Sequence, residues 1–196
     1  MEKVELLSPA GDLECLKVAV QNGANAVYFG LNKFNARINS TNFTKEELVE
    51  AISYAKLRGV KTHLTLNILI KDNEFEDALK DIEFAYNMGI DAVIIQDLGL
   101  AKKVIEIFPD LEVHSSTQMT VYNIDGVNKI KDLGFSRCVL ARELSINEIE
   151  NICKNSKIDI EVFIHGALCI SYSGQCLMSS MIGGRSGNRG KCARYM

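Results

Sequence analysis

Three cysteines near the end of the sequence are of a residue type that binds metals and carries out redox chemistry. Cys169, Cys176 and Cys192 lie among six glycines in residues 166–190, after an apolar run that ends at His165. Thiolates bind soft metals, and glycines let the backbone wrap closely around a bound group. The close Cys-x2–4-Cys pair of zinc fingers and the short ferredoxin spacing are both missing. The pattern favours an iron–sulfur cluster or another metal site, with a redox pair or inert cysteines as alternatives.

The same stretch is basic, although the whole chain carries a net charge of −3. From position 162 to 196 there is no Asp or Glu, and the charged residues are Arg185, Arg189, Lys191 and Arg194. A local positive charge suits an anionic partner such as a phosphate, a nucleic acid or a carboxylate, and it favours thiolate over thiol. A solvated basic loop without a ligand is the alternative interpretation.

Alternating strands and helices must position these residues. Apolar strand-like runs alternate with helical patterns from one end of the chain to the other. The expected strands are 4–7, 26–29, 61–68, 92–95, 112–115, 137–141 and 158–164. The expected helices are 12–22, 44–58, 73–88, 98–107, 121–133 and 146–154, and Thr44 with Glu47 has the pattern of a capping box.

A weak repeat supports this order of elements. In NGANAVYFG, RGVKTHLTLN, MGIDAVIIQD and LGFSRCVLARE, a glycine closes a helix and a strand begins a few residues later. Strict alternation predicts a parallel sheet with right-handed crossovers. Without a dinucleotide-binding glycine motif, an α/β fold of the (β/α)8 TIM-barrel type is favoured, incomplete here with about seven units.

The chain divides into residues 1–164, a partial barrel, and residues 165–196, a basic segment rich in cysteine and glycine. We expect the chain to be the N-terminal part of a longer protein, because an eighth strand and helix need more residues. An open barrel edge would expose apolar surface, and pairing with a second copy of the chain would cover it.

In such barrels the active site lies at the carboxyl ends of the strands. Polar side chains follow the predicted strands there, and together they favour a pocket for a polar, anionic ligand. The residues expected to line it are Asn67, Gln96, His114, Gln118, Arg142, Glu143 and His165. For His114, a structural histidine held by hydrogen bonds is the alternative.

The composition is that of a soluble globular protein, with 47% hydrophobic and 24% charged residues. No apolar run is long enough to span a membrane, and the acidic N-terminus lacks a signal peptide, so we expect a cytoplasmic protein with no membrane partner. We expect the other cysteines, Cys15, Cys138 and Cys153, to be small buried hydrophobic residues.

Several segments resemble one known family over essentially the whole chain. They are EVFIHGALCISYSGQCLMS, ELLSPAGDLECLKVAVQNGANAVYFG, THLTLNIL, AVIIQDLG and VHSSTQM. They are similar to the collagenase-like peptidase family of unknown catalytic type. The resemblance implies a barrel-like domain and a [4Fe–4S] cluster on four cysteines. Three of these map to Cys169, Cys176 and Cys192, and the family's fourth follows beyond Met196.

The resemblance implies two kinds of activity. The family label is peptidase, while other members hydroxylate a uridine in transfer RNA or a cytidine in ribosomal RNA, drawing on prephenate, or hydroxylate a quinone precursor. The residues show no serine nucleophile elbow, no HExxH helix and no pair of catalytic aspartates. A peptidase built on Cys169 and His165 would leave Cys176 and Cys192 without a role.

We therefore predict an iron–sulfur enzyme that hydroxylates an RNA base, with prephenate as a small anionic co-substrate. In this interpretation His165, His114, Arg142 and Glu143 are catalytic. Asn67, Gln96, Gln118 and the four basic residues of the last segment bind substrate. The alternatives are a collagenase-like peptidase and a non-catalytic fragment that binds RNA or another partner.

Overall fold

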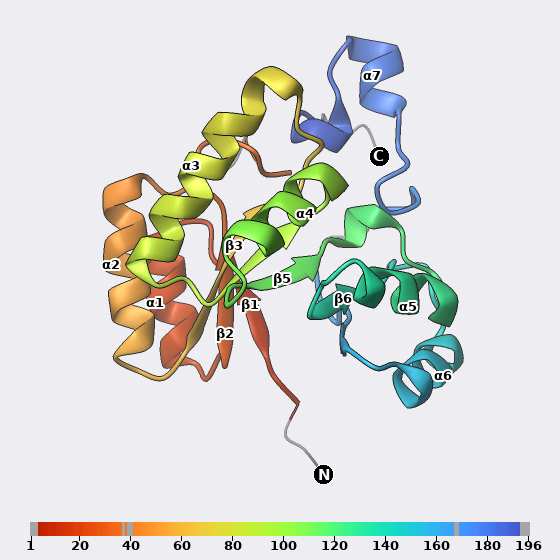
Figure 1. The fold of residues 1–196 in the computed structure, drawn as a ribbon, viewed down its shortest axis with the longest axis horizontal. Helices are drawn as coiled ribbons and strands as arrows, with labels where there is room; N and C mark the ends of the chain where they lie inside the picture. Colours follow the sequence, from red (N-terminus) through yellow and green to blue (C-terminus); the bar gives the residue numbers. More distant parts are fainter. Residues whose placement is uncertain (1–3, 37, 39–40, 167–168, 193–196) are drawn as a thin grey trace.

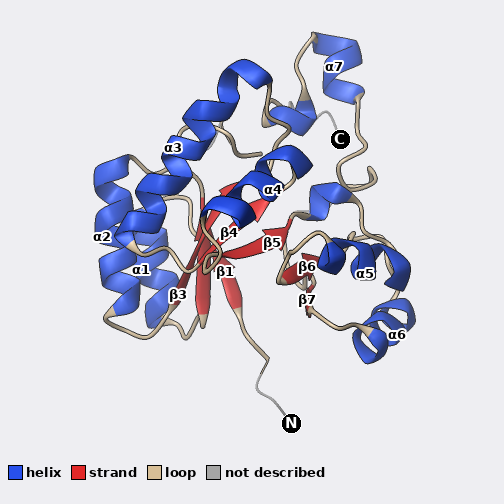
Figure 2. Ribbon diagram, in the orientation of Figure 1, coloured by secondary structure: helices blue, strands red, loops and turns tan. Residues whose placement is uncertain are grey.

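The computed structural model describes residues 4–36, 38, 41–166 and 169–192. Its strands form one parallel sheet in chain order, so each strand pairs with the next one along the sequence. Figure 2 shows this sheet curled, with helices on its outside. The strands are β1 (Leu7–Pro9), β2 (Ala26–Phe29), β3 (Lys61–Leu66), β4 (Ala92–Ile95), β5 (Glu112–Ser115), β6 (Arg137–Val139) and β7 (Asp159–Glu161).

One α-helix follows each of the first six strands, and all six helices pack on the outer face of the sheet (Figure 1). They are α1 (Leu13–Gln21), α2 (Lys45–Lys56), α3 (Asp72–Met88), α4 (Leu98–Ile107), α5 (Ile124–Asp132) and α6 (Ile146–Asn155). Two short 3-10 helices, η1 (Thr117–Met119) and η2 (Gly187–Arg189), and the short helix α7 (Met178–Gly183) were not expected from the sequence.

The predicted incomplete α/β barrel is thus confirmed, although several boundaries shift, and β3 and β6 each end two residues earlier than predicted. The first strand is Leu7–Pro9, because its pairing with β2 joins Ser8 to Val27 and leaves the apolar Val4 outside the sheet. The last strand is the short Asp159–Glu161, and α5 begins at Ile124 because Asn123 caps it by accepting from Gly126 N.

The turns between helices and strands follow the predicted glycine pattern. Gly23, Gly59, Gly89 and Gly134 have φ angles of 92°, 68°, 85° and 95°, the left-handed region that residues with a side chain avoid. The capping box of Thr44 and Glu47 is present at the start of α2. These local signals explain why helix ends were predicted more accurately than the edge strands.

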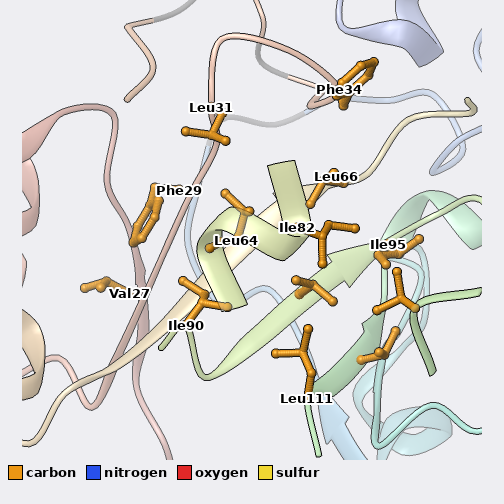
Figure 3. Packing of buried hydrophobic residues seen from close by; sticks show 14 of the residues in the cluster. Val27, Phe29, Leu31, Phe34, Leu64, Leu66, Ile82, Ile90, Ile95 and Leu111 are labelled. Carbon is orange, nitrogen blue, oxygen red and sulfur yellow. The ribbon is translucent and has the colours of Figure 1, made fainter. Parts of the chain in front are cut away.

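Alternate residues of each strand point outward and form the main core with the helices. Figure 3 shows Val27 and Phe29 of β2 and Leu64 and Leu66 of β3 on this face. All four are buried, as is Ile82 of α3, which packs in the same cluster. The hydrophobic core therefore lies between sheet and helices, and the inner face of the curled sheet is left for other residues.

The inner face carries charged groups near the amino ends of the strands. Arg137 of β6 is 8% exposed, and its Nη1 lies 2.6 Å from Glu5 Oε1 on the approach to β1. The same guanidinium lies 3.5 Å from Asp159 and 3.6 Å from Glu161, both of β7. Glu5 precedes β1 at one edge of the sheet, and Arg137 lies in β6 near the other edge. This ion pair therefore crosses the interior of the curved sheet.

β1 and β7 are the two edges of the sheet, and they do not pair with each other within the described chain. Leu6, Phe163 and Ile164 beside these edges are exposed. Pairing of two copies at this opening, and the division of the chain between residues 164 and 165, stay predictions. None of the helices in the described part of the chain is long and apolar enough to cross a membrane.

Candidate functional site

A hollow opens on the inner face of the sheet toward the carboxyl ends of the strands. It has about 310 Å³ of empty space, part of which is open to solvent. The residues that line it come from six strands or the turns that follow them: Tyr28, Thr65, Asn67, Ile94, Ser116, Thr117, Val139, Glu161 and Phe163. This is the end of a β/α barrel where ligands bind.

Glu161, the last residue of β7, supplies the carboxylate of the hollow. Its Oε2 is buried and accepts no hydrogen bond within the described residues, and its nearest cation is Arg137 at 3.6 Å. Burial raises the pKa of Glu161, against the opposing effect of Arg137. A buried carboxyl group with a raised pKa, held by an ion pair rather than by a hydrogen bond, is suited to bind a donor or to exchange a proton.

Several other polar groups of the hollow are already hydrogen-bonded to the backbone. Thr65 donates its hydroxyl to the Phe29 carbonyl, and Thr117 donates to the Leu140 carbonyl. Asn67 accepts from the Ala36 N–H with its Oδ1, at 2.9 Å. These bonds use the hydroxyl protons of Thr65 and Thr117 and fix the orientation of the Asn67 amide.

The cysteine-containing segment runs along this same end of the barrel and is anchored on both sides of it. A Cβ added to Gly174, at φ 72°, would lie 2.1 Å from the Gln118 carbonyl oxygen of η1. A Cβ added to Gly190 would lie 2.5 Å from the Asn35 carbonyl oxygen, in the loop after β2. Only glycine allows the backbone this close. Figure 1 shows α7 and the end of the described chain next to the start of α3.

An ion pair fixes the far end of this segment. Arg189 of η2 lies 2.6 and 2.8 Å from the two carboxylate oxygens of Glu74, in the first turn of α3. The guanidinium lowers the pKa of Glu74. Arg189 was predicted to bind substrate, but its charge is paired within the protein.

Arg142 and Glu143, predicted to be catalytic, hold the near end of the segment. Arg142 Nε donates to Ser173 Oγ at 3.1 Å, and its Nη2 donates to the Ser171 carbonyl at 3.1 Å. Glu143 Oε1 accepts from the Ser173 N–H at 2.8 Å. Ser173 is buried, and its carbonyl accepts from Thr120 Oγ1. The two charged residues after β6 therefore position the cysteine segment.

The thiols of the segment are accessible. Cys169 and Cys192 are exposed and Cys176 is half-buried, and no disulfide involves any of the six described cysteines. The Ser171 hydroxyl, and then the Met178 N–H, lower the pKa of Cys176 by hydrogen-bonding its thiolate. Within the described residues, however, no three Cys, His, Asp or Glu side chains converge as metal ligands do. As placed, the three sulfurs do not form a cluster site.

The other cysteines were predicted to be buried, and this is confirmed only for Cys138. Burial raises the pKa of its thiol to about 11. Cys15 on α1 and Cys153 on α6 are exposed, so the prediction for these two was wrong. Both helices turn the cysteine away from the sheet.

The expected position of His114 at the substrate face is corrected by the structure. His114 is buried inside β5, and its Nε2 lies 3.1 Å from Glu112 Oε2, toward the amino end of the strand. Its ring meets that of His63 edge-on, with centroids 4.9 Å apart. Burial lowers the pKa of both histidines, that of His63 to about 3. Both are interior groups of the barrel.

The remaining predicted residues divide between the hollow and the surface. Asn67 lines the hollow, while Gln96 Nε2 donates to the Gln118 carbonyl at 3.3 Å beside it. His165, Arg185 and Lys191 are exposed. Arg194 lies outside the described residues.

Strand ends alone did not reveal Tyr28, Thr65, Thr117, Glu161 and Phe163 as lining residues. For Tyr28, Thr65 and Glu161, which lie within strands, the signal that could have found them is alternation. Every second residue of β3 and of β7 faces inward, and polar residues at those inward positions are unusual inside a packed barrel.

Comparison with known proteins places the chain among a defined set of sequences. The model of peptidase family U32 matches residues 11–195. The chain is 42% identical over 192 residues to a 23S rRNA 5-hydroxycytidine synthase of Escherichia coli, covering 98% of this chain and 29% of that protein. It is 41% identical over 194 residues to tRNA hydroxylation protein P1 of Bacillus subtilis, covering 98% and 46%.

A further relative has a different name. A collagenase of Porphyromonas gingivalis is 35% identical over 205 residues, covering 97% of this chain and 48% of that protein. The chain spans about half or less of the length of these relatives. Among solved structures, the U32 peptidase Mk0906 has a TM-score of 0.68 at 15% identity, covering 83% of this chain and 70% of that one. This likeness shows the shared fold.

Proposed function

The chain belongs to peptidase family U32, and from that premise we propose that it takes part in hydroxylating a base of transfer or ribosomal RNA. The observation that carries the proposal is identity of 41–42% to two RNA hydroxylation proteins over 98% of the chain. A second support is the barrel end, where a hollow with one carboxyl group lies beside the thiol-bearing segment.

The peptidase alternative has less support in the described residues. A cysteine peptidase needs a thiolate paired with a histidine in a formed site, and His165 and Cys169 are both exposed. The polar side chains around the hollow contain no serine–histidine pair either.

The test is a comparison of RNA nucleosides by mass spectrometry, with and without the gene, in the organism that encodes this protein. The proposal expects one pyrimidine nucleoside carrying an added oxygen atom to disappear on deletion and to return when the gene is restored. An unchanged nucleoside profile, together with gelatin hydrolysis by the purified protein, would replace this proposal with the peptidase.

As part of the same proposal, Cys169, Cys176 and Cys192 bind an iron–sulfur cluster that supplies electron-transfer chemistry. Support comes from three accessible thiols within one glycine-rich segment and from the lowered pKa of Cys176. The sulfurs are not gathered in the described chain, so binding must bring them together, as metal binding does when it couples to folding. Iron and sulfide analysis after anaerobic purification tests this. Loss of both in Cys176→Ser, with retention in Cys153→Ser, is expected.

An anionic co-substrate, prephenate, belongs to the proposal as well. Its two carboxylates need cations, and Arg185 and Lys191 are exposed on the segment. The proposal expects prephenate to bind with an affinity that falls as salt rises and that drops in Lys191→Gln. Equal binding by Lys191→Gln and the wild-type protein would remove Lys191 from this role.

A further inference from the structure

We propose that the hollow around Glu161 binds a single uncharged ring, the RNA base itself, and that Glu161 accepts a hydrogen bond from the N–H edge of that ring. This inference rests on the proposed function. It adds where the base binds and which residue recognises it. None of the candidate residues predicted from the sequence, other than Asn67, belongs to this pocket.

The hydrogen-bonding state of the lining sets the chemistry of the ligand. Thr65 and Thr117 have already given their hydroxyl protons to backbone carbonyls. Arg137 Nη1 lies 3.6 Å from Glu161 Oε2, which is an ion-pair distance, and within the described residues no donor forms a hydrogen bond with this oxygen. A ligand that donates an N–H to this carboxyl group gains a shorter, charge-assisted hydrogen bond that a ligand with acceptors alone cannot make.

The Asn67 amide complements this carboxylate. Its Oδ1 is held by the Ala36 N–H, which orients the NH2 group for a ligand acceptor. The edge of a pyrimidine base presents donor and acceptor groups side by side, and enzymes that act on a base read that edge after extruding it from the stack. The Glu161 carboxylate and the Asn67 amide supply an acceptor and a donor for such an edge.

Charge decides against an anion in this position. The only described cation close to the hollow is Arg137, which already faces Glu5 at 2.6 Å, Asp159 at 3.5 Å and Glu161 at 3.6 Å. Three carboxylates around one guanidinium leave no net positive charge for a carboxylate or phosphate ligand. The anionic co-substrate of the proposed function therefore binds elsewhere, and the hollow is left for a neutral ring.

The walls of the hollow suit a flat ring. Two aromatic residues line it, Tyr28 from β2 and Phe163 beyond the end of β7. Phe163 is 48% exposed, so its ring borders the opening and offers a face for stacking.

The test is binding of uridine and cytidine to the purified protein, followed by NMR chemical shifts, with succinate as the anionic probe. The nucleosides are expected to shift resonances of the lining residues, while succinate leaves these unchanged. Glu161→Gln should weaken nucleoside binding about tenfold or more, because a hydrogen bond to a charged acceptor is lost. Glu5→Gln is the matched control, since Glu5 contacts the same Arg137 without lining the hollow.

A second variant keeps the test decisive if Glu161→Gln does not fold. Phe163→Leu changes a half-exposed residue outside the main core, so it should fold like the wild-type protein and still bind nucleosides more weakly. Succinate displacing the nucleosides from the lining residues, or equal weakening by Glu161→Gln and Glu5→Gln, would overturn the inference.

The outcomes also separate this inference from the proposed function. If Glu161→Gln loses nucleoside binding while deletion of the gene leaves the cellular RNA nucleosides unchanged, the binding pocket is supported and the proposed reaction is rejected. A hydroxylated nucleoside that depends on the gene but is made at full level by Glu161→Gln would keep the reaction and reject the pocket.

Discussion

At the scale of single residues, hydrogen bonds to neighbours decide which groups are reactive. Cys138 and Cys176 are both thiols, yet burial raises the pKa of Cys138 to about 11, and the Ser171 hydroxyl lowers the pKa of Cys176. The sequence suggested that the clustered cysteines are the reactive ones. It could not show that a serine five positions earlier stabilises the thiolate.

We expect Ser171→Ala to raise the pKa of Cys176, because the thiolate loses its main hydrogen-bond donor. The rate of alkylation of Cys176 at neutral pH should fall, and its pH profile should move to higher pH. Ser180→Ala is the control, since Ser180 Oγ contacts the Arg185 carbonyl in the same segment. Equal alkylation of all three proteins would show that Ser171 does not act on this thiol.

The buried His63 should make stability depend on pH. Its pKa is about 3 in the folded protein, against an ordinary value of 6.5. Between these two pH values the unfolded chain therefore binds a proton at His63 and the folded chain does not. Stability should therefore fall as pH drops below about 6.5, by up to about 1.4 kcal/mol per pH unit, until the folded value is reached.

Replacing the imidazole tests this sign. His63→Leu should lose less stability than the wild-type protein when urea unfolding is compared at about pH 7 and about pH 5. Glu112, whose pKa is also lowered, adds its own loss of stability only below its ordinary value of 4.5. Parallel losses for the two proteins would show that His63 is not buried and neutral.

At the scale of elements, pattern and capping predicted the strands and helices well in the middle of the chain and less well at its ends. Apolar runs and glycine turns located β2 to β6 because burial on both faces leaves a clear signal. β1 was displaced because strand pairing, rather than hydrophobicity, selects Ser8 and Pro9. The docking of α7 and η2 depends on contacts with distant loops, which no local pattern contains.

Gly174 should be essential for the position of the cysteine segment. Gly174→Ala would place a Cβ 2.1 Å from the Gln118 carbonyl oxygen, so the segment must leave η1. Hydrogen exchange of residues 169–192 should become faster while exchange of the barrel strands stays the same.

Gly184→Ala is the matched control for that variant. Gly184 also has a positive φ of 61°, but a Cβ there meets open space. Its cost should be limited to the backbone strain of about 1 kcal/mol. Similar hydrogen exchange in both variants would mean that the contact with Gln118 does not anchor the segment.

At the scale of the whole molecule, alternation of strands and helices was enough to predict an incomplete barrel. The inside of that barrel was not predictable, because the partners of Arg137 come from the approach to β1 and from β7, which are far apart in the sequence. The candidate site followed the same rule. The end of the barrel was located correctly, but Arg142, Glu143 and Arg189 have partners inside the protein that only the folded chain brings near.

The ion pair across the curl should matter for global stability. Arg137→Met would leave Glu5 and Glu161 without their cation, and we expect a loss of about 3 kcal/mol or more in the free energy of unfolding. Lys154→Met removes an exposed pair with Glu150 and should cost less than about 0.5 kcal/mol. Urea unfolding of both variants checks this, and similar small losses would contradict a role for Arg137 in closing the barrel.

The central claim is that RNA meets this protein at the carboxyl end of the barrel. The most direct measurement is photo-crosslinking of RNA that contains 4-thiouridine, with the linked peptides identified by mass spectrometry. The account predicts links to peptides that contain Tyr28 or Phe163, and their loss when free nucleoside is added in excess. Links confined to the outer faces of α1, α2 and α3, unaffected by free nucleoside, would contradict it.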